Sequence, residues 1–301
     1  METVGIKPIS AASRYLEVKD PCPVHDGGQW HLYGSGITGP NRFEILHATG
    51  PSLDGPWRLG NPVALAAGLS GGCLAAPGVI AEGSTHHMFL QTEYNVFDGS
   101  IEHLVSGDGG ETFCHAGTAL RSLARTEEAG IYDPHPAEIH GERYLVYSAF
   151  SAVGEADLHL AHSRTGDWHG PWGRLGPILR HEDVEFHNQR GDDGYEWGLE
   201  GAQLLELPDG RVLLNAVCFL PEGSPGSRQR VFFGIAPDVR GPYALRGPLI
   251  PPVGGEGCGE NGHASAVIAG SSVVLFFQER DAGDGVWRYA LTRIPLAELG
   301  A

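Results

Sequence analysis

The sequence predicts an all-β, single-domain, five-bladed β-propeller, and three observations favour it. A Gly-Pro-aromatic phrase recurs at residues 55–57, 170–172 and 241–243. The 45 Gly and 21 Pro among 301 residues indicate many turns and leave little room for long helices. Five short signatures, spaced by roughly sixty residues as in radial blades, each lead into a small-residue or apolar strand; they are Lys19-Asp20-Pro21, Ala75-Ala76-Pro77, Tyr132-Asp133-Pro134, Leu199-Glu200-Gly201 and Gly262-His263-Ala264.

The first two blades are expected at about residues 20–60 and 77–120. In the first, residues 29–34 and 43–48 alternate with the period of two that is typical of a strand. The second contains Ser106-Gly107-Asp108-Gly109-Gly110-Glu111-Thr112-Phe113. This phrase resembles the Asp-box turn of sialidase-type propellers, in which Ser, Asp and Thr hydrogen-bond a turn away from the catalytic centre. It therefore supports a propeller and not sialidase chemistry.

The last three blades are expected at about residues 133–179, 200–250 and 263–301. Only three strands are evident in the last of them, so residues 2–14 are expected to supply its outer strand and to close the ring without an open edge. The polar insert at residues 181–197 is expected to form a loop over one mouth of the ring, where loops commonly shape a binding site.

Composition and charge disfavour several classes of partner. The formal charge is −17, from 37 acidic and 20 basic side chains, and without a basic patch this predicts no nucleic acid and no membrane as partners. The N-terminal residues predict no secretory signal, and the sequence has no apolar run of the roughly eighteen residues that span a bilayer. The 5 Cys include no CxxC pair, which predicts neither a disulfide framework nor a zinc ribbon. We therefore expect a cytoplasmic protein with reduced thiols, of undefined oligomeric state.

Three of the five signatures carry a carboxylate, namely Asp20, Asp133 and Glu200. Because equivalent positions of successive blades converge on the axis of a propeller, these side chains are expected to surround one pocket. Cleavage of a glycosidic bond needs one carboxylic acid and one carboxylate, and a third carboxylate can raise the pKa of the acid and orient it. Asp-Pro is also an ordinary turn opener, so the interpretation depends on the three residues together.

In this order and spacing, Asp20, Asp133, Glu200 and His263 resemble the signatures of the family-43 glycoside hydrolases, which include arabinofuranosidases, xylosidases and arabinanases. The resemblance spans roughly residues 15–295. It implies an inverting hydrolase with Asp20 as general base, Glu200 as general acid and Asp133 as the residue that tunes the pKa of the acid. It also implies that His263 lies near the axis as a metal ligand; no cofactor is required, although Ca²⁺ or another ion on the axis fits the family. One departure is Ala202, where the family usually has Pro.

The resemblance predicts a carbohydrate as the small-molecule substrate, namely a small pentoside or oligosaccharide. The related invertase and levansucrase clans have Arg-Asp-Pro and Glu-Cys where this chain has Tyr132-Asp133-Pro134 and Glu200-Gly201, so a β-fructosidase-like hydrolase is the less favoured branch. A rival of another class keeps the acidic pocket without hydrolysis, either as a sugar-binding protein or as a biosynthetic enzyme.

Four further side chains are predicted to contact substrate, namely Glu93, Trp197, Gln278 and Arg280. Trp197 could stack on a sugar ring, and Arg280 could clamp a hydroxyl or a carboxylate, although a surface pair with Asp281 is the plainer interpretation of Arg280. The 15 His include no HxH or HExxH pattern, and the adjacent His86 and His87 would point to opposite faces of a strand. The sequence therefore predicts no tight zinc site.

Overall fold

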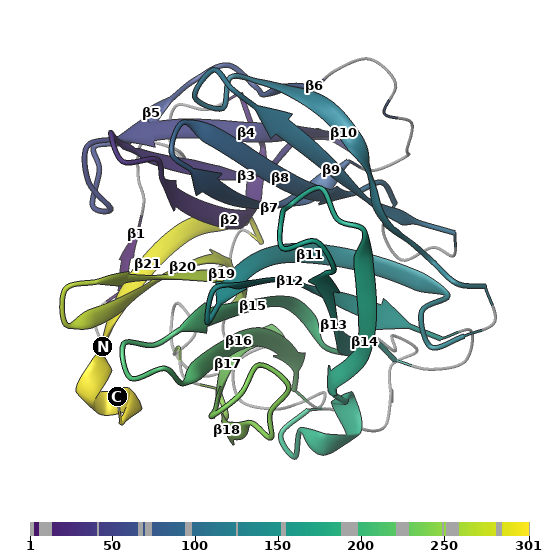
Figure 1. Cartoon of the computed structure of the whole chain (residues 1–301). Coiled ribbons are helices and arrows are strands. Elements are labelled where there is room, and N and C mark those ends of the chain that lie inside the picture. The colour runs from purple at the N-terminus through teal and green to yellow at the C-terminus, as the bar shows by residue number, and fades with distance from the viewer. Residues whose placement is uncertain are drawn as a thin grey trace.

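The structure is a five-bladed, all-β propeller, as predicted. The computed structural model describes residues 3–5, 14–40, 42–65, 69, 74–93, 98–124, 126–151, 155–187, 198–220, 229–248, 250, 259–280 and 285–300. Within these ranges the chain forms strands β1 to β21, two short 3-10 helices, η1 (His181–Asp183) and η2 (Leu296–Leu299), and no α-helix. The innermost strands of the five sheets contact one another in a closed cycle, in the order β2, β7, β11, β15, β19 and β2 again. The five sheets are therefore blades around one axis (Figure 1).

Three blades are four-stranded antiparallel sheets whose strands follow one another in chain order from the axis outward. The first blade contains β2 (Glu17–His25), β3 (Trp30–Gly39), β4 (Arg42–Gly50) and β5 (Arg58–Leu59). The third contains β11 (Gly130–Ile139), β12 (Glu142–Phe150), β13 (Asp157–Ser163) and β14 (Trp172–Leu179). The fourth contains β15 (Glu200–Glu206), β16 (Val212–Phe219), β17 (Gln229–Ala236) and β18 (Ala244–Arg246).

The other two blades each take one outer strand from elsewhere in the chain. The second blade contains β7 (Ala75–Glu82), β8 (Thr85–Gln91), β9 (Ser100–Ser106) and β10 (Thr112–Arg121), and β6 (Ala64–Leu65) pairs with β10 in parallel. The fifth contains β19 (Glu260–Ala269), β20 (Ser272–Arg280) and β21 (Arg288–Pro295), and β1 (Thr3–Gly5) adds to β21. The first and last strands of the chain therefore lie side by side in one sheet (Figure 1).

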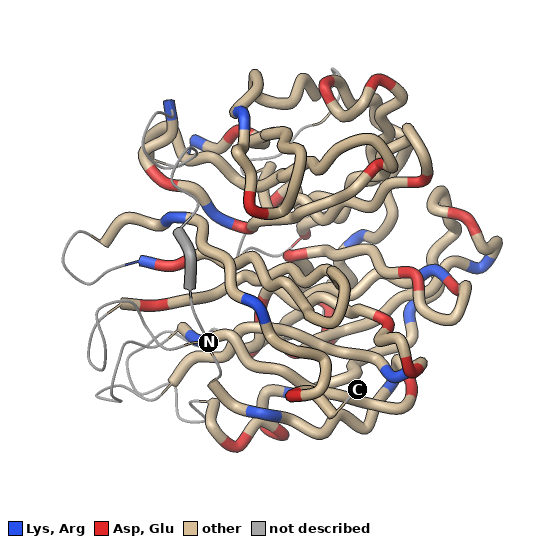
Figure 2. Tube along the Cα trace, turned by 90° about the vertical axis from the view of Figure 1, so that its left-hand side faces the viewer, with Lys and Arg blue, Asp and Glu red and all other residues tan. Residues whose placement is uncertain are grey.

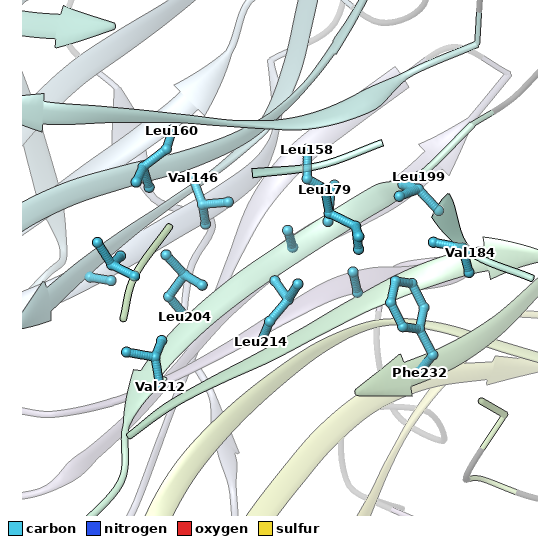
Figure 3. Packing of buried hydrophobic residues seen from close by; sticks show 14 of the residues in the cluster. Val146, Leu158, Leu160, Leu179, Val184, Leu199, Leu204, Val212, Leu214 and Phe232 are labelled. Atoms are coloured by element: carbon cyan, nitrogen blue, oxygen red, sulfur yellow. The ribbon is translucent and has the colours of Figure 1, made fainter. Parts of the chain in front are cut away.

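The hydrophobic core is divided among the five interfaces between neighbouring blades. Each buried cluster combines side chains of two successive blades. Figure 3 shows the cluster between blades three and four, where Val146 and Leu160 lie opposite Leu204 and Leu214. A middle strand such as β16 is covered on both faces, which explains why its sequence is nearly continuously apolar rather than alternating.

Rings that follow the repeated Gly-Pro turns contribute to these interfaces. Trp57 and Trp172 are buried, and Tyr243 packs against the cluster between blades three and four. The indole N–H of Trp57 donates to the carbonyl of Leu53 (3.3 Å), and the hydroxyl of Tyr243 donates to Val239 (2.7 Å). The recurring phrase is therefore a structural element of the blades.

The Asp-box turn lies between β9 and β10 and has the predicted hydrogen bonds. The hydroxyl of Ser106 and the backbone N–H of Thr112 both donate to Asp108 Oδ1, at 2.7 and 3.1 Å. Lys and Arg positions are scattered along the described trace among the acidic positions (Figure 2). In the described part of the chain, no helix has the length and apolar character needed to cross a bilayer.

Candidate active site

A β-bulge interrupts the innermost strand at the same place in every blade. The pairing of each of these strands with its neighbour shifts just before a small or proline-rich segment. Within each bulge one residue has a left-handed backbone conformation: Asp20 (φ 57°), Ala76 (50°), Asp133 (50°), Gly201 (55°) and His263 (36°). This conformation costs a non-glycine residue about 1–2 kcal/mol, so the surrounding packing must hold it in place.

Blade four differs from the register that the sequence signatures suggest. The signatures align Glu200 with Asp20 and Asp133, but the structure places Gly201 at the left-handed position, one residue later. Glu200 therefore corresponds in its pairing to Lys19 and Tyr132, the residues just before the bulge. Glycine fits there for two reasons, because it accepts a positive φ and because a Cβ would lie 2.9 Å from the ring nitrogen Nδ1 of His263.

Side chains of the preceding blade hold these bulges. The amide oxygen of Gln278 accepts a hydrogen bond from the backbone N–H of Asp20 (3.0 Å), and that of Gln91 accepts one from Asp133 (2.8 Å). Ser35 Oγ accepts one from Ala76 in the same way (2.9 Å). Gln278 is completely buried and its carboxamide positions Asp20; its contact with substrate stays a prediction.

The three predicted carboxylates meet around one imidazole. Nδ1 of His263 lies 3.0 Å from Asp20 Oδ1, and its Nε2 lies 3.5 Å from Glu200 Oε2 and 3.7 Å from Asp133 Oδ2. The side chain of Asp20 is 14% exposed, whereas those of Glu200 and Asp133 are almost fully buried. Ionisable side chains from blades one, three, four and five therefore form one group at the axis.

The environment shifts the pKa values of this group in different directions. Burial alone would lower the pKa of His263, but the charges of Asp133 and Asp20 raise it well above its usual value. Burial alone would raise the pKa of Asp20, but the charge and hydrogen bond of His263 lower it below its usual value. Burial, opposed by His263 and reinforced by Glu200 and Asp20, raises the pKa of Asp133 to about 7. At neutral pH the site therefore combines an ionised carboxylate, a carboxyl that can hold a proton and an imidazolium.

Two hydrogen bonds hold the carboxyl groups of Glu200 and Asp133 in place. The hydroxyl of Tyr132 donates to Glu200 Oε1 (3.3 Å), and the N–H of Gly201 donates to Asp133 Oδ2 (3.2 Å). Tyr132 directly precedes Asp133 in the chain, and Gly201 directly follows Glu200. Each short signature therefore contains both an acid and the hydrogen-bond donor for the other acid. No role beyond its place in that signature was predicted for Tyr132.

A pocket opens onto the group. Among the described residues, Glu200 does not line it. Its lining residues are Lys19, Asp20, Phe43, Ala75, Ala76, Gln91, Asp133 and His263.

The remaining predicted contact residues are placed differently. Glu93 is partly buried just after the end of β8, and its contact with substrate stays a prediction. Trp197 lies outside the described residues. Arg280 forms an ion pair with Glu260 and places its guanidinium 4.7 Å from the ring centre of Trp287. The guanidinium of Arg280 is therefore held by its own blade, and its contact with substrate stays a prediction.

Sequence reasoning missed the support that Ser35 gives to the bulge of blade two. A signal was available, because Ser35, Gln91 and Gln278 occupy matching places, each paired with the residue that precedes a bulge. A polar residue at that place of a middle strand, in an otherwise apolar run, indicates an acceptor for a backbone N–H of the next blade.

Asp133, Glu200 and His263 also form a group that could hold an ion, since one ligand atom of each lies within 4.8 Å of the others. The proton on His263 would have to leave before its nitrogen could bind a metal. Any ion would therefore compete with the imidazolium that already balances the carboxylates, and His263 as a metal ligand stays a prediction.

Comparison with solved structures places the fold among known hydrolases. A thermostable family-43 glycoside hydrolase superposes with a TM-score of 0.68 at 17% identity, covering 92% of this chain and 89% of the other. The endo-arabinase of Bacteroides thetaiotaomicron gives 0.69 at 12% identity, with 93% and 95% covered. The fold is that of the family-43 glycoside hydrolases. The arabinanase of Cellvibrio cellulosa, solved with arabinohexaose, gives 0.64 at 17% identity, with 93% and 92% covered.

The similarity to this family-43 fold is one of structure alone. No model of a known protein family matches the sequence, and no curated protein matches it. Identities of 12–18% to the solved structures show the fold and leave activity and substrate to be argued from the residues.

Proposed function

We propose that this protein is a glycoside hydrolase that cleaves a small pentoside or oligosaccharide with inversion of configuration. The observation that carries the proposal is the convergence of Asp20, Asp133 and Glu200, from three different blades, on one buried imidazole. Three ionised carboxylates repel one another, so gathering them in one place costs free energy. Such groups of interacting acids are typical of sites that transfer protons. The opposite pKa shifts of Asp20 and Asp133 suit a base and a proton-holding acid.

In the proposed reaction Asp20 accepts a proton from a water molecule as the water oxygen bonds to the anomeric carbon. The bond from that carbon to the leaving oxygen breaks, and Glu200 donates a proton to this oxygen. Asp133 passes its proton to Glu200 and so returns Glu200 to the acid form; solvent water then takes the proton from Asp20 and supplies one to Asp133, which restores all three carboxyls. His263, as an imidazolium, holds Asp20 in position and offsets the charge of the three carboxyls.

The proposed substrate contains a pentose, with arabinose as the first choice. Several proteins with the same fold are arabinanases, and one was solved with arabinohexaose. The lining of the pocket beside Asp20 and Asp133 includes Phe43, an aromatic side chain of the kind that can pack on a sugar ring.

One observation favours the non-hydrolytic rival. The ring of His263 contacts Asp20 through one nitrogen and Glu200 through the other, so it lies where an inverting enzyme leaves room for water between base and acid. If the ring keeps this position with ligand bound, the pocket would bind a sugar without hydrolysing it or would use its acids in a biosynthetic reaction.

The test is release of p-nitrophenol from pentosides, hexosides and fructosides by the wild-type protein, Asp20→Asn and Glu200→Gln. Glu206→Gln is the matched control, because Glu206 lies at the far end of the same strand and is partly exposed. We expect turnover of one pentoside by the wild type and the control, with losses of roughly 10²–10⁴-fold in the two site variants. Proton NMR of the first-formed sugar should show inversion.

Each other outcome selects a rival. A fructoside hydrolysed with retention would indicate a β-fructosidase-like enzyme. Silence across the panel from folded protein, together with sugar binding measured by calorimetry, would overturn hydrolysis and support the binding or biosynthetic alternative.

A further inference from the structure

A second group of ionisable side chains lies between blades one and two, away from the axis. Asp26 occupies the turn between β2 and β3, His31 lies at the beginning of β3, and His86 lies at the beginning of β8. Gln91, which supports Asp133, ends β8, so the length of a strand, roughly 15 Å at about 3.3 Å per residue, separates this group from the candidate active site.

The three side chains are arranged as a ligand set. One ligand atom from each of Asp26, His31 and His86 lies within 4.8 Å of the other two. Bonds of about 2.0–2.2 Å to Zn²⁺ keep ligand atoms within roughly 4.4 Å of one another, so a small closure would suffice. Asp26 Oδ1 accepts hydrogen bonds from the N–H groups of Gly28 (2.8 Å) and Gln29 (2.9 Å). Its Oδ2 is thereby directed at Nε2 of His31, 3.1 Å away.

Each of these two histidines has a partner for its Nδ1. Nδ1 of His86 lies 2.6 Å from the hydroxyl of Tyr33, and Nδ1 of His31 lies 2.9 Å from Nε2 of His47. A metal-binding histidine commonly uses its second nitrogen in this way, which fixes the ring and the tautomer. With its proton on Nδ1, each ring would keep its Nε2 lone pair for an ion.

The environment of the Nε2 atom of His86 indicates a missing ligand. His86 is completely buried, and in the described part of the chain this nitrogen has no hydrogen-bond partner. Buried polar atoms are nearly always hydrogen-bonded, so such an atom calls for an unseen partner. The other nitrogen is occupied by Tyr33, which leaves Nε2 as the atom that can bind an ion.

We propose that Asp26 Oδ2, His31 Nε2 and His86 Nε2 bind a divalent transition-metal ion, with Zn²⁺ as the first choice. Two imidazoles and one carboxylate suit Zn²⁺ and its neighbours in the first transition row. Water completes the coordination from the side of Asp26, whose side chain is 16% exposed. Because Asp26 and His31 belong to blade one and His86 to blade two, the ion fastens these blades together.

The electrostatics of the site agree with this role. Burial lowers the pKa of His86 to about 4, so its ring is neutral and its lone pair is available at neutral pH. Burial acts to raise the pKa of Asp26, but the hydrogen bonds from the backbone N–H groups of Gln29 and Gly28 lower it far below its usual value, so the carboxylate is ionised.

The Asp-box turn covers the site. Any Cβ at Gly110 would clash with the hydroxyl of Tyr33 and lie 2.9 Å from Nδ1 of His86. Gly110 donates its N–H to Ser106 Oγ (3.0 Å) within the turn. The turn is therefore held against the Tyr33 hydroxyl and the His86 ring. The spacing of the histidines along the chain does not indicate the site, because its ligands come from two blades.

The test uses the full chain, stripped with EDTA and titrated with Zn²⁺ against a chromophoric chelator, with bound metal measured by mass spectrometry. The site variants are His86→Gln and Asp26→Asn; the asparagine keeps an oxygen for the N–H groups of the turn. His87→Gln is the matched control, since its side chain points to the other face of β8. All are also made with His263→Gln, which separates this site from any ion on the axis.

We expect one Zn²⁺ per chain that persists in His87→Gln and His263→Gln, and binding weakened by more than about tenfold in Asp26→Asn and His86→Gln. At a hundredfold excess over Kd, Zn²⁺ should raise Tm by roughly 3–6 °C in the wild type and not in the site variants. Equal Zn²⁺ content and equal Tm shifts in the wild type and a folded Asp26→Asn variant would overturn the proposal. The readouts do not depend on glycosidase activity.

Discussion

Blades two and three have the same backbone at the axis but different chemistry. The inner strand of each has a bulge with one residue at φ 50°, and the N–H of that residue is bound by a side chain of the preceding blade. In blade two this residue is Ala76, and in blade three it is Asp133. The strained backbone is therefore a property of the repeated scaffold. The carboxyl of Asp133 occupies a backbone position that forms in blade two without any carboxyl.

The largest expected effect comes from making blade three resemble blade two. Asp133→Ala keeps a residue type that this backbone tolerates at Ala76, so the bulge should persist, but it removes the carboxyl that shares a proton with Glu200. We expect hydrolysis of the preferred aryl glycoside to fall by at least about 10²-fold, with an unchanged circular dichroism spectrum. Near wild-type turnover in this variant would show that the two blades are equally idle in catalysis.

The buried acid should also make stability depend on pH in a way that Ala76 cannot. The pKa of Asp133 is raised to about 7, so between pH 4 and 6 the folded chain binds more protons at this site than the unfolded chain. Its contribution to the free energy of unfolding therefore falls as pH rises, by up to about 3 kcal/mol. In this window Asp133→Asn should remove that fall in urea titrations; identical slopes for both proteins would contradict the assignment.

Blade four offers a third version of the same position. Gly201→Ala puts a Cβ at φ 55°, 2.9 Å from the ring of His263, so either the bulge or the imidazole must move. We expect a loss of about 1–3 kcal/mol in the free energy of unfolding and a higher KM or lower kcat through displacement of His263. Gly210→Ala, at another glycine of positive φ with no close atom in the way, separates the backbone cost from the clash.

The smallest effect tests the strain itself. Ala76→Gly removes the Cβ at φ 50°, and glycine adopts this conformation without steric cost. We expect the free energy of unfolding to rise by up to about 1 kcal/mol, because relief of strain exceeds the added entropy of the unfolded chain. A clear loss of stability in thermal unfolding would mean that the packing of this methyl group matters more than the strain.

Much of the fold followed from local signals. The repeat of turn signatures and the strand alternation predicted five blades, and the Asp-box phrase predicted the turn that Asp108 forms with Ser106 and Thr112. The parallel addition of β6 to blade two could not be predicted from the sequence. A two-residue strand that pairs with residues nearly fifty positions away is too short to show a strand pattern.

The sequence by itself determined which residues could do chemistry: Asp20, Asp133, Glu200 and His263 each belong to a local turn signature, and turns depend on nearby residues. Only the tertiary structure decided how these residues are used. It moved Glu200 one residue away from the bulge, assigned the carboxamide of Gln278 to a backbone N–H of another blade, and brought His86 to Asp26 and His31. Register and contacts between blades arise from packing over long separations in sequence, which no local pattern encodes.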